Sequence, residues 1–178
     1  MPNQTGSESD IVHVFITGGT IDSVFDAIHD TVVPRETSTI PKYLSAIQPR
    51  HPLEFTELCM KDSRELTQDD LENLVKAIES SSATKVLITH GTYTMPDSAR
   101  FLEARLKRKD QVIILTGSII PLDGFTFSDG GFNLGFAMAK LEALPPGIYV
   151  SMNGNIFSPA EVMKLLSEGR FSSIFNTE

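Results

Sequence analysis

Three short apolar segments of the chain end in the same way, at glycine flanked by hydroxyl residues. Short β-branched runs that stop at a turn signal are typical of buried parallel strands. The carboxyl ends of parallel strands meet at one edge of a sheet, and open α/β folds bind their ligands at that edge. We therefore expect the hydroxyl groups to gather at one site. The segments are residues 11–16 before Thr17-Gly18-Gly19-Thr20, residues 86–88 before Thr89-His90-Gly91-Thr92, and residues 112–115 before Thr116-Gly117-Ser118.

The rest of the chain alternates between strand and helix signals. Further strands are expected at residues 53–60 and 148–152, and helices at residues 38–48, from Thr67, from Thr94, at 132–144 and at 158–168. Alternation of this kind predicts an α/β fold of three αβα layers with a mostly parallel sheet. Asn153-Gly154 is a strong two-residue turn signal and adds an antiparallel hairpin at one edge.

Two segments carry less regular signals. Residues 22–36 interrupt any helical periodicity with Asp26, His29 and Asp30. A connection of this length without clear structure is often a lid, so we expect a mobile lid loop that contains Asp22 and Phe25. Ser158-Pro159-Ala160-Glu161 combines a cap, a first-turn proline and a capping-box acid, which predicts the last helix.

Composition excludes several classes of function. The formal charge of −8, from 23 acidic and 15 basic residues, argues against binding of nucleic acid. No apolar run is long enough to span a bilayer. Residues 1–10 lack the basic and apolar regions of a signal peptide, so we expect a flexible N-terminus and a cytoplasmic protein. Cys59 is the only cysteine and is expected to be a packed core residue.

The motifs leave a threonine-centred site as the candidate chemistry. There is no dinucleotide fingerprint or phosphate-binding loop, and the four histidines show no metal-ligand spacing, so we expect neither cofactor nor metal. A threonine hydroxyl becomes a nucleophile when a neighbouring group takes its proton. We expect Thr20 and Thr92 to face each other, with Lys140 reaching in to lower a hydroxyl pKa. The alternative is that the threonines only cap turns and Lys140 is solvated.

At this level of detail the motifs resemble those of a known family. Thr17-Gly18-Gly19-Thr20-Ile21 is similar to the first signature of the bacterial-type L-asparaginases, and His90-Gly91-Thr92-Tyr93-Thr94-Met95 is similar to their second. Asp62-Ser63-Arg64 resembles the family's substrate-contacting segment. The resemblance runs from about residue 11 to residue 153 and covers the family's N-terminal domain. Because the chain ends near the start of the family's second domain, it resembles the short asparaginases, and we expect a single domain over residues 1–178.

The resemblance implies a two-step hydrolysis of a small amide such as L-asparagine. Thr20 would attack the amide and release ammonia, and water would then cleave the acyl-enzyme. Thr92 and Lys140 match the second catalytic threonine and its lysine. The resemblance also implies a homodimer or larger homo-oligomer. The positions that match substrate-binding residues are Gly19, Ser63, Arg64, Gly91 and Tyr93.

Two positions depart from the family pattern. Tyr93 stands where the family has an aspartate that pairs with the substrate ammonium, and Phe25 is the nearest aromatic to the expected lid tyrosine. These departures leave open a second hypothesis, a catalytically degenerate module that binds a small amide or amino acid. A third hypothesis, an amidotransferase component acting on charged tRNA, is disfavoured by the negative charge.

Overall fold

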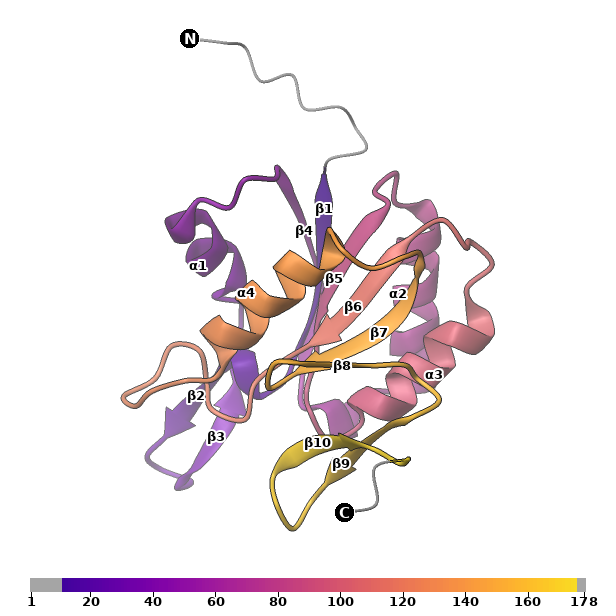
Figure 1. Cartoon of the computed structure of the whole chain (residues 1–178). Coiled ribbons are helices and arrows are strands. Elements are labelled where there is room, and N and C mark those ends of the chain that lie inside the picture. The colour runs from indigo at the N-terminus through magenta and orange to yellow at the C-terminus, as the bar shows by residue number, and fades with distance from the viewer. Residues whose placement is uncertain (1–10, 176–178) are drawn as a thin grey trace, which may run out of the picture.

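The computed structural model of the chain describes residues 11–175. A six-stranded sheet forms the centre of the molecule (Figure 1). The sheet is parallel except at its last pair, β7 and β8, which are antiparallel. Its strands, in spatial order, are β4 (Leu53–Lys61), β1 (Val12–Gly18), β5 (Lys85–Thr89), β6 (Val112–Thr116), β7 (Gly147–Met152) and β8 (Asn155–Phe157).

Helices cover both faces of the sheet (Figure 1). α1 (Ile40–Ile47) and α4 (Gly130–Leu141) pack on one face, and α2 (Gln68–Ser80) and α3 (Met95–Arg105) pack on the other. Successive side chains of a strand point to opposite faces of the sheet, so each strand contributes to the hydrophobic core on both faces. In β5, Leu87 packs on the side of α1 and α4, whereas Val86 and Ile88 pack on the side of α2 and α3. The expected αβα architecture is confirmed.

Local signals place most of these elements correctly. Thr67 and Asp70 form the reciprocal bonds of a capping box at the start of α2. Asn153 and Gly154 have φ angles of 54° and 77°, and this left-handed pair makes the tight turn between β7 and β8. The prediction of a flexible N-terminus over residues 1–10 lies outside the described residues. No helix within residues 11–175 has the length and apolarity needed to cross a membrane.

The segment over residues 22–36 is not the unstructured loop that its sequence predicts. A short 3-10 turn (Thr20–Asp22) leads into an antiparallel hairpin of β2 (Ser23–Asp26) and β3 (Thr31–Pro34). Of the polar residues that interrupt helical periodicity, Asp26 ends β2, and His29 and Asp30 lie in the tight connection between the two strands, where Asp30 has a φ of 51°. The prediction failed because strands of four residues are too short to show alternation clearly.

The predicted last helix is also wrong. Its capping-box bonds exist, since the backbone N–H and the hydroxyl of Ser158 both donate to Glu161, but only one turn follows. The chain then forms an antiparallel hairpin of β9 (Val162–Leu165) and β10 (Arg170–Ser173). Ser173 donates to the Glu161 carboxylate and Ile174 donates to its carbonyl. These long-range bonds, with Val162 and Phe171 buried in the core, outweigh the local helix signal.

Candidate active site

A pocket opens at the carboxyl edge of the sheet, where the strand ends meet. Its volume is about 210 Å³, below the roughly 300–1,000 Å³ of sites for drug-sized ligands, so it suits a small molecule. The lining residues come from the turns that follow β1, β4 and β5, and from β9. They are Gly19, Thr20, Asp62, Ser63, Arg64, Gly91, Thr92, Tyr93 and Lys164. The structure thus brings together eight residues that lie in the two signatures and the Asp62-Ser63-Arg64 segment.

Close backbone packing holds these strand ends together. Gly19 has φ 85° and ψ −177°, a conformation that only glycine adopts readily. A Cβ on Gly19 would lie 2.3 Å from the Gly91 Cα, and a Cβ on Gly91 would lie 2.6 Å from the Ser63 Cβ. The two signatures therefore contact each other directly through their glycines, which explains why neither position accommodates a side chain.

The other strand-end hydroxyls do not reach the pocket. Thr17 donates to the Thr89 carbonyl at 3.0 Å, and Thr116 donates to the Ser151 carbonyl at 2.8 Å. Ser118 donates to the carbonyl of Ile120. These hydroxyls tie neighbouring segments together, whereas Thr20 and Thr92 line the pocket. The pattern of three similar strand ends thus contributes two hydroxyl groups to the site, not three.

A lysine from β9 contacts the second threonine. The Lys164 Nζ donates a hydrogen bond to the Thr92 Oγ1 at 2.7 Å. Burial lowers the pKa of Lys164, with the positive charge of Arg64 acting in the same direction and Asp62 opposing it. The start of β9, two residues before Lys164, is tied to α3, because Arg100 donates to the Val162 carbonyl at 2.6 Å. A lysine whose pKa is lowered is suited to exchange a proton with the hydroxyl beside it.

Lys140 does not occupy the position that the sequence predicts for it. It lies in the last turn of α4, and its Nζ sits 5.2 Å from the centre of the Phe136 ring. It is absent from the pocket lining, and Lys164 contacts Thr92 instead. The assignment failed because Lys164 falls in the segment predicted as a helix. Residues 162–165 read Val-Met-Lys-Leu, without the polar–apolar alternation of a half-buried strand, so no local sequence signal identifies Lys164.

The Asp62-Ser63-Arg64 segment forms a short 3-10 turn at the pocket wall. The Arg64 guanidinium binds Asp62 through two bonds of 2.9 Å, and this arginine keeps the pKa of the carboxyl below its usual value. Ser63 is buried beside Gly91, and its carbonyl accepts a bond from the Thr94 hydroxyl at 2.9 Å. Ser63 and Arg64 thus both line the pocket, with Arg64 already paired to a carboxylate.

Tyr93 places an aromatic ring at the mouth of the pocket. Its side chain is about half exposed, at 51%. The guanidinium of Arg64 lies 5.6 Å from the ring centre and the Lys164 Nζ lies 6.0 Å from it. Both cations are within the range of cation–π attraction. The residue that departs from the family signature therefore contacts the two cationic side chains of the site.

The β2–β3 hairpin follows Thr20 directly, but its aromatic residue points elsewhere. Phe25 makes an edge contact with Phe125 at 5.8 Å and is not among the pocket residues. Asp22 is fully buried and accepts bonds from the Ser38 hydroxyl and from the backbone and hydroxyl of Thr39. Asp22 therefore anchors the hairpin to the start of α1, and the movement of the hairpin as a lid stays a prediction.

His90 lies buried beneath the pocket. Its Nδ1 is 2.7 Å from the Gly91 carbonyl, which can only accept, so Nδ1 carries the proton. Burial lowers the pKa of His90 to about 4, and the ring is neutral at pH 7. Its bond steadies the carbonyl directly before Thr92. No group of three or more His, Cys, Asp or Glu side chains within residues 11–175 is arranged to hold a metal ion.

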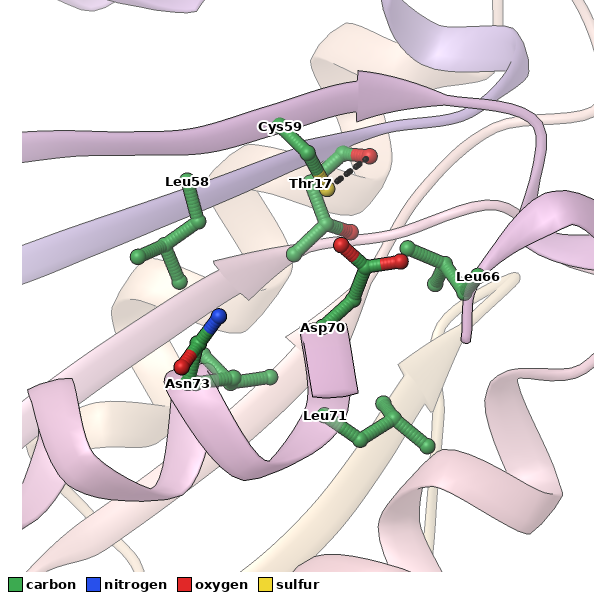
Figure 2. A pocket seen from close by; sticks show the side chains of 8 residues that line it. Thr17, Leu58, Cys59, Leu66, Asp70, Leu71 and Asn73 are labelled. Atoms are coloured by element: carbon green, nitrogen blue, oxygen red, sulfur yellow. Dashed lines mark hydrogen bonds between the residues drawn. The ribbon is translucent and has the colours of Figure 1, made fainter. Parts of the chain in front are cut away.

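A second, much smaller cavity of about 20 Å³ lies between β4 and α2 (Figure 2). The Cys59 thiol donates to the Thr17 carbonyl at 3.6 Å, and Asp70 stands nearby with its carboxylate bound by Lys61. Burial raises the pKa of Cys59 to about 11, so the thiol is protonated at neutral pH. Cys59 is accordingly a packing residue and not a nucleophile.

Comparison with known proteins agrees with this site. The family model for the N-terminal asparaginase domain matches residues 11–174. The glutaminase-asparaginase of Acinetobacter glutaminasificans is 35% identical over 109 residues, which are 57% of this chain and 32% of that protein. The glutaminase-asparaginase of Pseudomonas fluorescens biotype A is 34% identical over 92 residues, 50% of this chain and 25% of that protein. The matches thus cover a third or less of these curated relatives.

Solved structures give the same result for the fold. The thermostable L-asparaginase from Thermococcus kodakarensis superposes with a TM-score of 0.80 at 26% identity, over 94% of this chain and 52% of the other. The probable cytoplasmic L-asparaginase from Campylobacter jejuni gives 0.75 at 27% identity, over 92% and 51%. The chain spans about half of each. From its sequence, its fold and the arrangement of its strand ends, the chain belongs to the asparaginase family, as that family's N-terminal domain.

Proposed function

We propose that the chain is an amidohydrolase that cleaves a small carboxamide of the L-asparagine type through a threonine acyl-enzyme. The contact between Lys164 and Thr92, in the pocket that Thr20 also lines, carries this proposal. A hydroxyl becomes an effective nucleophile only beside a group that can take its proton. Burial lowers the pKa of Lys164, which increases the fraction of neutral amine available for that role.

In the first step the Thr20 oxygen attacks the carbonyl carbon of the amide. The proton of Thr20 passes to the pair of Thr92 and Lys164, and the carbonyl oxygen gains a negative charge. Return of the proton to the nitrogen lets ammonia leave and forms an ester with Thr20. The backbone N–H of Gly19 already donates to the Lys61 carbonyl at 2.9 Å. This N–H group is therefore not available to stabilise the developing oxyanion.

In the second step water replaces ammonia as the reaction partner. The neutral Lys164 accepts a proton through Thr92 as the water attacks the ester carbon, and the proton returns to the Thr20 oxygen when the acid product leaves. Atoms and charges balance over the two steps, since one amide and one water give one acid and one ammonia. We include assembly as a homo-oligomer in the proposal.

Ammonia release tests this function. The purified chain is expected to release ammonia from at least one of L-asparagine, L-glutamine or butanedioic acid monoamide (succinamate). Thr20→Ala is expected to lower the rate of ammonia release at least about 10³-fold, because it deletes the attacking oxygen. Thr20→Ser retains the oxygen and is the matched control, with part of the activity preserved. Absence of ammonia with every amide, or an unchanged rate in Thr20→Ala, contradicts the proposal.

One observation favours a second candidate, a module that binds a small amide without turnover. The residue nearest to the expected lid tyrosine, Phe25, has no hydroxyl and packs on Phe125. A ligand that raises the melting temperature of the parent and of Thr20→Ala equally, with no ammonia from either protein, would select this candidate.

A further inference from the structure

The charged side chains that line the pocket do not suit a zwitterionic ligand, which carries both a carboxylate and an ammonium group. Among the described residues that line the pocket, two are cationic, Arg64 and Lys164, and one is anionic, Asp62. Asp62 receives three bonds from Arg64, two from the guanidinium and one from the backbone N–H. Glu65 also interacts with Arg64, but it lies outside the pocket lining. The one carboxylate of the described lining is therefore already paired with the adjacent arginine.

An ammonium group on a ligand would find no unpaired carboxylate among the described residues that line the pocket. If Lys164 is charged, the lining carries a surplus positive charge that repels the ammonium. If Lys164 is neutral, Arg64 and Asp62 cancel each other, and still no carboxylate is unpaired. The π face of Tyr93 is the remaining place where a cation is attracted, and Arg64 and Lys164 already stand 5.6 and 6.0 Å from its centre.

A carboxylate on the ligand, in contrast, finds suitable donors in the same pocket. The side chain of Arg64 is 64% exposed and commits two of its five N–H donors to Asp62. The remaining N–H donors of Arg64 and the Lys164 amine belong to side chains that line the same pocket as Thr20. A ligand with one carboxylate and one carboxamide thus places its anion against Arg64 while its amide carbon reaches the threonines.

We infer that the substrate class of this pocket is the monoamide of a short dicarboxylic acid without an α-amino group, in preference to an α-amino acid amide. The inference rests on the proposed amidohydrolase function and specifies its substrate. Tyr93 is the specificity-determining residue, since its ring lines the pocket beside both cationic side chains and adds no negative charge to balance them.

Steady-state kinetics with two matched substrates test the inference. Succinamate and L-asparagine differ only in the α-ammonium, and kcat/KM for succinamate is expected to be at least tenfold higher. Tyr93→Asp supplies an anion and is expected to lower the ratio of the two kcat/KM values at least tenfold. Tyr93→Phe keeps the ring without a charge and is expected to retain the parent ratio. The half-exposed position of Tyr93 makes both variants compatible with folding, which a thermal melt checks.

The binding of products separates this inference from the proposed function. Titration calorimetry of the parent is expected to give a Kd for succinate at least tenfold below that for L-aspartate, whether or not any amide is hydrolysed. Absence of ammonia with succinamate, L-asparagine and L-glutamine alike would overturn the amidohydrolase proposal, and the calorimetry would still decide the specificity. Equal or tighter binding of L-aspartate, an asparagine preference in the parent, or an unchanged ratio in Tyr93→Asp overturns the inference.

Discussion

Lys164→Met is expected to lower kcat about 10²- to 10⁴-fold, the usual contribution of a positioned acid or base. Methionine keeps the length of the side chain but removes the amine that contacts the Thr92 hydroxyl at 2.7 Å. The rate of ammonia release under saturating amide measures the effect. Lys140→Met is the matched control, because Lys140 lies beside Phe136 and outside the pocket, and its kcat is expected to equal that of the parent.

A second variant and a pH profile distinguish a base from a fixed positive charge. The guanidinium of Lys164→Arg cannot be deprotonated in proteins, so this variant is expected to be as impaired as Lys164→Met. In the parent, kcat is expected to rise with pH and to level off above the lowered pKa of Lys164, because the neutral amine is the active form. Full activity in Lys164→Arg, or a large loss in Lys140→Met, would contradict the assignment.

Gly19→Ala is expected to reduce the free energy of unfolding by about 3–5 kcal/mol. The φ of 85° and ψ of −177° at Gly19 cost a side-chain-bearing residue about 1–3 kcal/mol. The new methyl group would also lie 2.3 Å from the Gly91 Cα, and backbone cannot move aside as a flexible side chain does. Urea denaturation followed by circular dichroism measures the change.

Gly135→Ala is the matched control for that substitution. Gly135 lies in the middle of α4, and a Cβ built there meets nothing within 4 Å. Replacement of a helical glycine by alanine is therefore expected to stabilise the protein by up to about 1 kcal/mol. Equal stability losses in the two variants, or a Gly19→Ala protein as stable as the parent, would show that the two signatures do not pack as described.

The sequence predicts the part of the site that local patterns determine. A buried strand that ends at glycines places Thr20 and Thr92 at one edge, because parallel strands share their direction, and in the structure both threonines line one pocket. The αβα layers follow from the alternation of strands with amphipathic helices. Capping and turn residues such as Thr67 and Asn153 act on backbone groups only a few positions away. The helix start predicted at Thr67 and the hairpin predicted at Asn153 are confirmed.

Contacts between distant segments account for what the sequence does not reveal. Lys164 and Thr92 are 72 positions apart, and no local pattern connects them. The hairpin that carries Lys164 is fixed by the bonds from Ser173 and Ile174 to Glu161, which no short window contains. The pairing of Asp62 with Arg64 is local. That the described lining offers no unpaired carboxylate follows only from the set of residues that the fold brings to the pocket.

Trapping of the acyl-enzyme tests the central claim most directly. The chain is mixed with a substrate amide, quenched in acid within the first turnover, digested and analysed by mass spectrometry. We expect the peptide that contains Thr20 to gain the mass of the acyl group, with the adduct absent in Thr20→Ala and accumulated in Lys164→Met if deacylation is the slower step. An adduct on the peptide that contains Thr92, or turnover without any adduct on Thr20, would contradict the account.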